Sequence, residues 1–319
     1  MANGGVHVVF GAGQIGPLLA ERLIDLGKQV RVVRRSAGAV RVPGAEVIRG
    51  DAMDPAVCAE AARGAETVYH CMNTAYFARV WRETLPRLQE NLIAAAGRAG
   101  ARLVVLDNVY ALGRTGGRPM NEDTPPNPCS RKGAIRAELH EALQAAVRRG
   151  DVRAAIGRAS DFYGPNAGNS MMGERLLRQL LAGKPGQLLF DPDLPHTYHY
   201  SRDVAAGLAT LGLDPSADGL WMLPCAPAGT SRTLIRLLGA ALGRADARIS
   251  RMPPLLFRTA ALLVPFLREV QEMMYQFEEP FLVDDSRFRA RFGATATSLE
   301  DGARETAAWA RTALGATPA

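Results

Sequence analysis

The residues best suited to chemistry are Gly11, Gly13 and Gly16, which belong to the sequence GAGQIG near the start of this 319-residue chain. An apolar, strand-like run at 6–10 precedes them, and a helical pattern follows. In this spacing the first glycine permits a tight turn, the second lets the backbone approach a pyrophosphate, and the third lets the helix pack on the strand. The turn therefore predicts dinucleotide binding at a helix N-terminus, with a purely structural strand–turn–helix as the alternative.

Two arginines, Arg34 and Arg35, end the next strand-like run, about 18 residues beyond Gly16, where an NAD-binding chain carries an acidic residue for the ribose hydroxyls. Guanidinium groups suit a 2′-phosphate instead, because charge-assisted hydrogen bonds contribute roughly 1.5–3 kcal/mol each. The sequence therefore predicts NADP(H) as the cofactor. The alternative is a pair of solvated surface arginines.

The composition argues against several other functions. The net charge is +6, but the 38 basic residues are scattered among 32 acidic ones rather than gathered in a stripe, so we expect no nucleic-acid partner. The four cysteines are far apart and form no Cys-x-x-Cys motif, which suits a reducing cytoplasm without disulfides. The first residues, MANGG, lack the basic start and apolar core of a secretion signal. We therefore expect a cytoplasmic location.

The most membrane-like stretch lies at 259–267, between two arginines, and a proline interrupts it. It is far shorter than the roughly 20 apolar residues that span a bilayer. We therefore interpret it as a core or lobe helix and expect no membrane partner.

Strand-like runs alternate with helical patterns along the first half of the chain. This alternation predicts an α/β fold, a Rossmann-like doubly wound parallel sheet with a smaller C-terminal substrate lobe. We expect strands at 6–10, 30–34, 46–49, 66–71, 102–106 and 152–157, with helices at 81–99 and 133–149. The expected domains are a dinucleotide-binding domain at 1–165, to which 201–225 returns, a substrate lobe at 166–200 and 226–312, and a frayed tail at 313–319.

Several further motifs occur in the expected order: the Gly-Asp pair at 50–51, TVYHCMN at 67–73, DNVYALG at 107–113, RASDFYGP at 158–165 and HTYHYSRDVA at 196–205. With these motifs the chain resembles the extended short-chain dehydrogenase/reductase family over nearly its whole length. The resemblance implies a nicotinamide dinucleotide bound by Gly11, Gly13, Gln14, Ile15, Gly16, Arg34, Arg35, Asp51, Cys71, Met72, Asn73, Lys132, Ala159, Ser160 and Phe162.

The chain departs from this family at the catalytic positions. Family catalysis uses a serine after the fifth strand and a Tyr-x-x-x-Lys motif on the following helix, where the lysine lowers the pKa of the tyrosine that donates the proton. Here Asn108 takes the place of the serine. One register places Cys129 and Gly133 at the Tyr and Lys positions, and another places Ser130 and Ala134 there. Neither register recovers the motif.

A working enzyme needs a substitute, because loss of a general acid costs about 10²–10⁴ in rate. Asn108 could donate its amide to the developing alkoxide, or a phenol from Tyr76, Tyr110 or Tyr163 could enter the site from another loop. A hydroxyl beside the ketone of the substrate could also supply the proton. Lys132 could reach the nicotinamide ribose or be a solvated lysine at a helix start. We therefore expect the catalytic residues to be Asn108, Tyr110 and Lys132.

The expected substrate is not a nucleotide sugar. Asp161 and His196 stand where the nucleotide-sugar enzymes of the family place an asparagine and a diphosphate-binding arginine, and Asp191 and Asp193 would add negative charge. His196 and His199 form no metal site, because residues three apart on a strand face opposite sides and no third ligand lies nearby. We expect substrate contacts from Thr74, Tyr76, Asp161, Tyr163 and His196. Soft apolar surface could come from Met171, Met172, Leu176, Leu177, Met273, Met274, Tyr275 and Phe277, and the alternative for each of these apolar residues is ordinary core packing.

The sequence as a whole favours NADPH-dependent reduction of a ketone on an apolar, polyhydroxylated aromatic molecule. The absent Tyr-x-x-x-Lys motif and the DNVYALG segment resemble the ketoreductases that act on angucyclinones, which are aromatic polyketides made in antibiotic biosynthesis. The alternatives are an epimerase or dehydratase and a non-catalytic NADP(H)-sensing protein. We expect a monomer or homodimer.

Overall fold

The computed structural model describes residues 5–35 and 42–315, and the chain divides into two compact units. Unit 1 consists of Met1–Ala111, Arg131–Ala159 and Val204–Leu223, and unit 2 of Leu112–Ser130, Ser160–Asp203 and Pro224–Ala319. Each unit has its own hydrophobic core. Of the expected tail at 313–319, the first residue closes the last helix and residues 316–319 lie outside the described residues.

Unit 1 is built on a seven-stranded parallel sheet with the order β11-β6-β5-β4-β1-β2-β3. Its strands are β1 (Val6–Phe10), β2 (Gln29–Arg34), β3 (Glu46–Arg49), β4 (Ala65–His70), β5 (Arg102–Asn108), β6 (Arg153–Ala159) and β11 (Gly219–Met222). Its helices are α1 (Gly16–Asp25), α2 (Pro55–Ala61), α3 (Ala78–Ala99), α4 (Arg131–Arg149) and α6 (Ser201–Leu213, from Val204 onward), and the 3₁₀ turn η1 (Tyr110–Leu112) begins in it.

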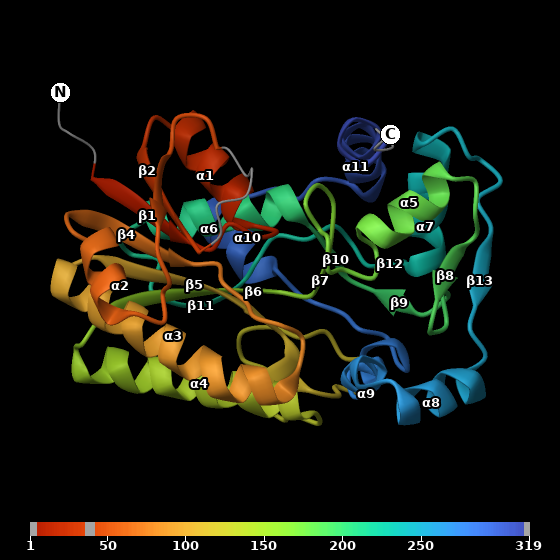
Figure 1. Ribbon diagram of the computed structural model, residues 1–319, viewed down its shortest axis with the longest axis horizontal. Helices are drawn as coiled ribbons and strands as arrows, with labels where there is room; N and C mark the ends of the chain where they lie inside the picture. The colour runs from red at the N-terminus through yellow and green to blue at the C-terminus, as the bar shows by residue number, and fades with distance from the viewer. Residues whose placement is uncertain (1–4, 36–41, 316–319) are drawn as a thin grey trace. The chain divides into compact units, whose positions relative to one another are not determined.

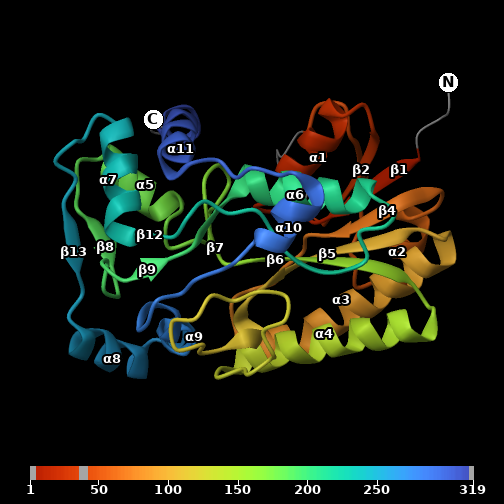
Figure 2. The ribbon, with the colours of Figure 1, turned by 180° about the vertical axis from the view of Figure 1, so that it is seen from behind.

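Helices cover both faces of this sheet, with α3 and α4 on one face and α1 and α6 on the other (Figures 1 and 2). Because both faces are covered, the central strands are nearly continuous apolar runs, as in the buried β1 and β5. The predicted doubly wound parallel sheet is confirmed. The expected strands and helices agree with the observed bounds to within three residues at each end.

Unit 2 contains short strands and helices in place of a large sheet. Its two-stranded sheets pair β10 (Tyr198–Tyr200) with β7 (Asp161–Tyr163), β12 (Gly229–Thr230) with β9 (Pro195–His196), and β13 (Ile249–Arg251) with β8 (Gly186–Leu188). Its helices are α5 (Glu174–Leu181), α7 (Ser231–Ala241), α8 (Pro254–Leu263), α9 (Pro265–Gln271), α10 (Ser286–Phe292) and α11 (Leu299–Ala313), with the 3₁₀ turn η2 (Met274–Phe277). The hydrophobic core joins residues of α5, α7 and α11.

The core of unit 2 contains, or packs against, most of the apolar residues for which a ligand surface and core packing were the alternatives. Most of these methionines, leucines and aromatic residues are buried, and four of them belong to this core: Met172, Leu176, Leu177 and Phe277. Met273 and Tyr275 are buried as well. These side chains pack within unit 2, so the apolar pattern in the sequence marks a core.

The stretch at 259–267, which was expected to be a core or lobe helix, lies in unit 2. It is helical, but it covers the end of α8 and the start of α9, and Leu262, Leu263, Val264 and Phe266 are exposed. It is therefore not a core helix. None of the helices in residues 5–35 and 42–315 is long and apolar enough to cross a bilayer.

Candidate functional site

The glycine turn after β1 has the geometry that dinucleotide binding requires. Gly11 has a φ of 111°, and a Cβ on Gly16 would lie 1.8 Å from the carbonyl oxygen of Gly11, so only glycine fits at both positions. A Cβ on Gly13, by contrast, would meet no described atom within 4 Å. The backbone at Gly13 therefore borders open space where a pyrophosphate can approach closely.

The N-terminus of α1 is suited to an anion. Its N-cap is Ile15, a buried side chain, and within the described part of the chain no side chain caps the helix and no acidic residue lies in the first turn. The first N–H groups of a helix have no partner within the helix, and the helix dipole favours negative charge there. Together with the space at Gly13, these groups fit the pyrophosphate of a nicotinamide dinucleotide.

Three arginines gather at the carboxyl ends of β2 and β3. Arg34 is half-buried and Arg35 is exposed, and Arg34 pairs in register with Arg49 of the parallel neighbour β3. Arg49 was not predicted from the sequence, although its place at the end of a predicted strand was the available signal. Asp51 is exposed and its carboxylate accepts a hydrogen bond from the Met53 N–H at 3.0 Å, which shapes the turn leading to α2.

The loop after β4 is held by a buried histidine. His70 Nδ1 accepts a hydrogen bond from the Met72 N–H at 3.2 Å, and burial, reinforced by Arg136, lowers the pKa of His70 to about 4. The imidazole is therefore neutral near pH 7. Cys71 is a thiol rather than a thiolate, because burial raises its pKa to about 12. Beyond it, the exposed Asn73 accepts a hydrogen bond from the Thr74 N–H at 2.9 Å.

Two phenols and a lysine meet in unit 1. The hydroxyls of Tyr76 and Tyr110 lie 3.3 Å apart and both side chains are half-buried. Lys132 Nζ lies 4.6 Å from the centroid of the Tyr76 ring, and its side chain is 0% exposed. The alternative of a solvated lysine at the start of α4 is therefore wrong. The buried Trp81 packs against both rings, edge-on to Tyr76 and stacked on Tyr110.

Asn108 ends β5, two residues before Tyr110. Its Oδ1 accepts a hydrogen bond from the Tyr110 N–H at 3.1 Å, which starts η1 and orients the side chain. The Nδ2 amide is then the donor end of the group. The helix that follows, α4, carries Lys132 and no tyrosine.

A buried charge cluster lies next to this group. Arg158 Nε lies 2.9 Å from Asp107 Oδ2, and Arg136 Nη1 lies 3.5 Å from Asp107 Oδ1. All three side chains are buried. The Arg136 guanidinium also lies over the ring of Trp81, with Cζ 4.9 Å from the centroid. Two guanidiniums share one carboxylate, so the cluster keeps an excess of positive charge within unit 1.

In unit 2, His196 and Asp161 form a close pair. His196 Nε2 lies 2.8 Å from Asp161 Oδ2, and the imidazole is 2% exposed and stacked on Phe277. His199 is also buried, and its Nδ1 accepts a hydrogen bond from the Ser160 N–H. Both histidines are therefore enclosed within unit 2 and do not lie at its surface. No group of three or more His, Cys, Asp and Glu side chains in the described residues is placed to hold a metal ion.

Tyr163 is wrong as a candidate proton donor or substrate contact. It is 0% exposed in the core of unit 2, tilted against Tyr200, and burial raises its pKa. A Cβ on Gly302 of α11 would lie 2.3 Å from its hydroxyl, so the helix closes over the phenol. The ring fills a core and is inaccessible to solvent.

The acidic residues expected to repel a diphosphate are paired. Arg232 forms a two-point ion pair with Asp193, with distances of 2.6 and 2.7 Å, and Arg251 lies 3.7 Å from Asp191. These cations reduce the negative field that the sequence suggested.

The last three expected cofactor residues follow one another closely. Ala159 ends β6 and is fully buried, Ser160 donates its hydroxyl proton to the Thr197 carbonyl, and Phe162 is half-buried.

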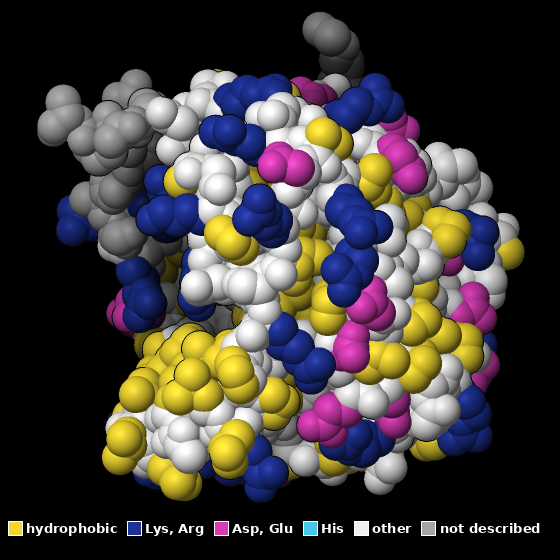
Figure 3. Space-filling view, turned by 90° about the vertical axis from the view of Figure 1, so that its right-hand side faces the viewer, with side chains coloured by type: hydrophobic (Ala, Val, Ile, Leu, Met, Phe, Trp, Pro, Cys, Tyr) yellow, Lys and Arg dark blue, Asp and Glu magenta, His cyan; other side chains and the backbone are white. Residues whose placement is uncertain are grey.

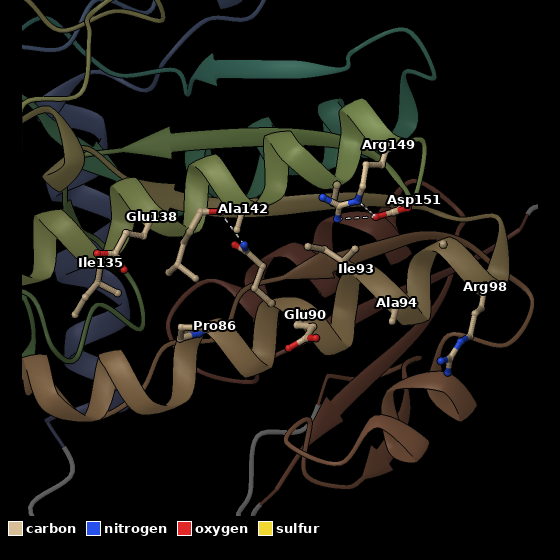
Figure 4. Close-up of a pocket in the computed structure, with 14 residues that line it drawn as sticks. Pro86, Glu90, Ile93, Ala94, Arg98, Ile135, Glu138, Ala142, Arg149 and Asp151 are labelled. Atoms are coloured by element: carbon tan, nitrogen blue, oxygen red, sulfur yellow. Dashed lines mark hydrogen bonds and ion pairs between the residues drawn. The ribbon is translucent and has the colours of Figure 1, made fainter.

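A groove of about 770 Å³ lies between α3 and α4 on the surface of unit 1 (Figure 4). Ile93 and Ala142 line it, and the Arg149–Asp151 ion pair lies at one end. The groove contains none of the predicted site residues, so it is distinct from the glycine turn and the phenol pair.

Comparisons with known proteins place this geometry in context. The chain resembles the solved dTDP-glucose 4,6-dehydratase DesIV from Streptomyces venezuelae, described with NAD and TYD bound, at 19% identity and a TM-score of 0.80 over 97% of this chain and 98% of that one. It also resembles UDP-glucose 4-epimerase from Thermotoga maritima, described with UDP-glucose (20%, TM-score 0.77, 97% and 99%). UDP-N-acetylglucosamine 4-epimerase from Bacillus cereus is similar as well (16%, TM-score 0.78, 98% and 98%). At these identities the likeness shows the fold.

No curated protein sequence matches the chain significantly. The model of the NAD dependent epimerase/dehydratase family matches residues 7–219, which run from the second residue of β1 through the glycine turn to the first residue of β11. The chain therefore belongs to the NAD dependent epimerase/dehydratase family.

Proposed function

We propose that this protein is an NADPH-dependent ketoreductase that reduces a ketone on an apolar, polyhydroxylated aromatic substrate of the angucyclinone type. The observation that carries the proposal is the group formed by Asn108, Tyr76, Tyr110 and Lys132 in unit 1. It contains a proton donor, an amide donor and a buried cation, which are the functions that the family's Ser and Tyr-x-x-x-Lys would supply. In this proposal the chain reduces the ketone without that motif.

The glycine turn and α1 N-terminus fit the pyrophosphate of the cofactor, and Arg34, Arg35 and Arg49 fit a 2′-phosphate. NADPH supplies a hydride when bound. The chain must then hold the ketone and protonate its oxygen.

Tyr110 is the proposed proton donor. As the carbonyl carbon gains the hydride, the C=O π pair moves to oxygen and the Tyr110 O–H gives its proton to that oxygen. The Tyr76 hydroxyl, 3.3 Å away, can return a proton to Tyr110, and the Lys132 ammonium places positive charge against the ring of the phenol pair. Asn108 Nδ2 can donate to the same substrate oxygen as charge develops.

The test is NADPH oxidation with an aromatic ketone that bears an adjacent hydroxyl, and with the same ketone methylated at that hydroxyl. We expect Tyr110→Phe to lower kcat by about 10²–10⁴ and Tyr76→Phe and Asn108→Ala by about tenfold each. Tyr163→Phe is the matched control, because it removes a buried hydroxyl that has no hydrogen-bond partner among the described residues. It should change kcat less than twofold.

A small effect of Tyr110→Phe combined with loss of activity on methylation would assign the proton to the substrate and leave the reductase function standing. Absence of NADPH turnover with every ketone, despite tight binding, would favour the NADP(H)-sensing alternative.

The second candidate is an epimerase or dehydratase, which the family, the UDP-glucose bound by one solved neighbour and the dTDP-glucose dehydratase activity of another support. The His196–Asp161 pair argues against it, because the histidine is buried and already engaged with a carboxylate where a diphosphate-binding arginine is expected. A thermal-shift screen decides this point. Clear stabilisation by UDP-, GDP- or dTDP-sugars would make this candidate the leading one.

A further inference from the structure

An apolar surface patch covers α8 and α9 of unit 2. Figure 3 shows hydrophobic side chains gathered there, at the lower left. We call these six residues the apolar tip, with their exposed fractions: Leu255 (74%), Leu256 (56%), Leu262 (68%), Leu263 (84%), Val264 (44%) and Phe266 (48%). Among the described residues the only other large apolar side chains exposed to this degree are Leu26 and Val47. Large contiguous apolar patches mark interaction sites.

The apolar tip has a defined structure. α8 ends at Leu263, Val264 forms the turn, and α9 begins at Pro265. Arg268 crosses the turn, and its Nε donates to the Ala261 carbonyl at 2.9 Å. The buried Phe257 anchors α8 from below. The leucines therefore project from a fixed helix–turn–helix.

The charged residues in the sequence segment that contains the apolar tip are all positive. Between Asp246 and Glu269 the charged residues are Arg248, Arg251, Arg258 and Arg268, with no carboxylate among them. Arg258 and Arg268 are exposed, and the exposed Arg251 lies 3.7 Å from one carboxylate, Asp191. The fringe of the tip is therefore cationic and complementary to an anionic partner.

We propose that the apolar tip docks on an anionic lipid bilayer, with its leucines and Phe266 in the boundary between headgroups and acyl chains and its arginines among the phosphates. Projecting apolar side chains beside basic residues are the pattern of interfacial anchors, and arginine can extend its charged end toward the headgroups. The expectation of no membrane partner rested on the length needed to span a bilayer, and an interfacial helix pair needs no span.

A second copy of the chain is a poorer occupant. A two-fold contact through the apolar tip would use the same surface on each side, so one arginine-containing fringe would face another. Like charges in contact would oppose that association. The charge pattern therefore favours lipid phosphate over self-association.

The test is co-sedimentation of the full-length protein with vesicles of phosphatidylcholine alone or mixed equally with phosphatidylglycerol. We expect at least tenfold stronger binding to the anionic vesicles, weakened by raised salt. Leu255→Ser combined with Leu263→Ser should weaken this binding at least tenfold, and Arg251→Gln with Arg258→Gln should remove the preference for anionic lipid. Val47→Ser, an exposed apolar position in unit 1, is the matched control and should bind as wild type.

Thermal unfolding and NADPH binding of each variant establish that it is folded. Equal binding of the wild type and the double leucine variant, or no binding to anionic vesicles, would overturn the proposal. So would a dimer in lipid-free sedimentation that the leucine changes dissociate while vesicle binding stays absent. That result would assign the apolar tip to self-association.

Discussion

The arginines at the ends of β2 and β3 allow the cofactor preference to be predicted in magnitude. We expect Arg34→Ala, Arg35→Ala and Arg49→Ala together to weaken NADPH binding roughly 30- to 150-fold and to leave NADH almost unchanged. Arg34 is half-buried, so its hydrogen bond to a 2′-phosphate should contribute about 1.5 kcal/mol, the lower end for a charged group. Arg35 and Arg49 are exposed, and each should add about 0.5 kcal/mol because water and salt screen exposed pairs. The sum of about 2–3 kcal/mol corresponds to the stated factor.

Calorimetric titration of both cofactors at low and moderate salt measures this difference. Arg34→Ala alone should account for about tenfold, and Arg34→Ala with Arg35→Ala for somewhat more. Arg87→Ala, an exposed arginine of α3, is the control for a change in net charge and should affect neither cofactor. The difference between NADPH and NADH should shrink as salt rises.

Equal weakening of both cofactors by the triple change would refute the assignment, because only NADPH carries the 2′-phosphate. A wild type that binds NADH as tightly as NADPH would refute it too. Arg34→Glu tests whether the cofactor preference can be reversed. A carboxylate at the end of β2 can accept from the ribose hydroxyls, so this variant should reverse the preference toward NADH.

Further outcomes follow from unit 1. Gly13→Val should leave thermal stability unchanged but weaken NADPH and NADH alike, at least tenfold by calorimetry, whereas Gly16→Ala should lower the Tm because its Cβ would lie 1.8 Å from a carbonyl oxygen. Stability should fall as the pH drops from about 6.5 to about 4, since the unfolded His70 then binds a proton that the folded one, with its pKa lowered to about 4, does not. That loss is about 3 kcal/mol in urea unfolding, and His70→Asn should remove it. Asp107→Asn should cost about 3–5 kcal/mol at pH 7, because two buried guanidiniums lose their shared carboxylate; an unchanged urea midpoint would contradict this.

The large sheet could be predicted because its strands carry a strong local signal. In a parallel sheet covered on both faces the strands are apolar runs, which the sequence displays directly. Gly11 and Gly16 follow the first of these runs, at positions where only glycine fits. The short strands of unit 2 carry no such signal. β9 has two residues and β7 has three, too few for a periodic pattern.

The sequence alone could not predict which individual side chains of the site are buried. Tyr163 and His196 were expected to contact a substrate, and both are enclosed by segments distant in the chain, α11 and η2 respectively. The reverse occurs at Leu263, whose apolar neighbours suggested a core although the side chain is exposed. Local pattern reports hydrophobicity, and the tertiary fold decides which face is covered.

The buried charge cluster next to the phenol pair is positioned by the register of two strands, and no sequence motif marks it. Asp107 and Arg158 are partners across β5 and β6, so the ion pair links two strands at the end where Asn108 emerges. Arg136 joins the same carboxylate from α4 and packs on Trp81 of α3, which in turn supports the ring of Tyr110. The absence of a tyrosine from α4 therefore need not dismantle the proposed site. The strands and helices that flank it already hold a phenol beside Asn108, and a proton donor can be retained there without the usual motif.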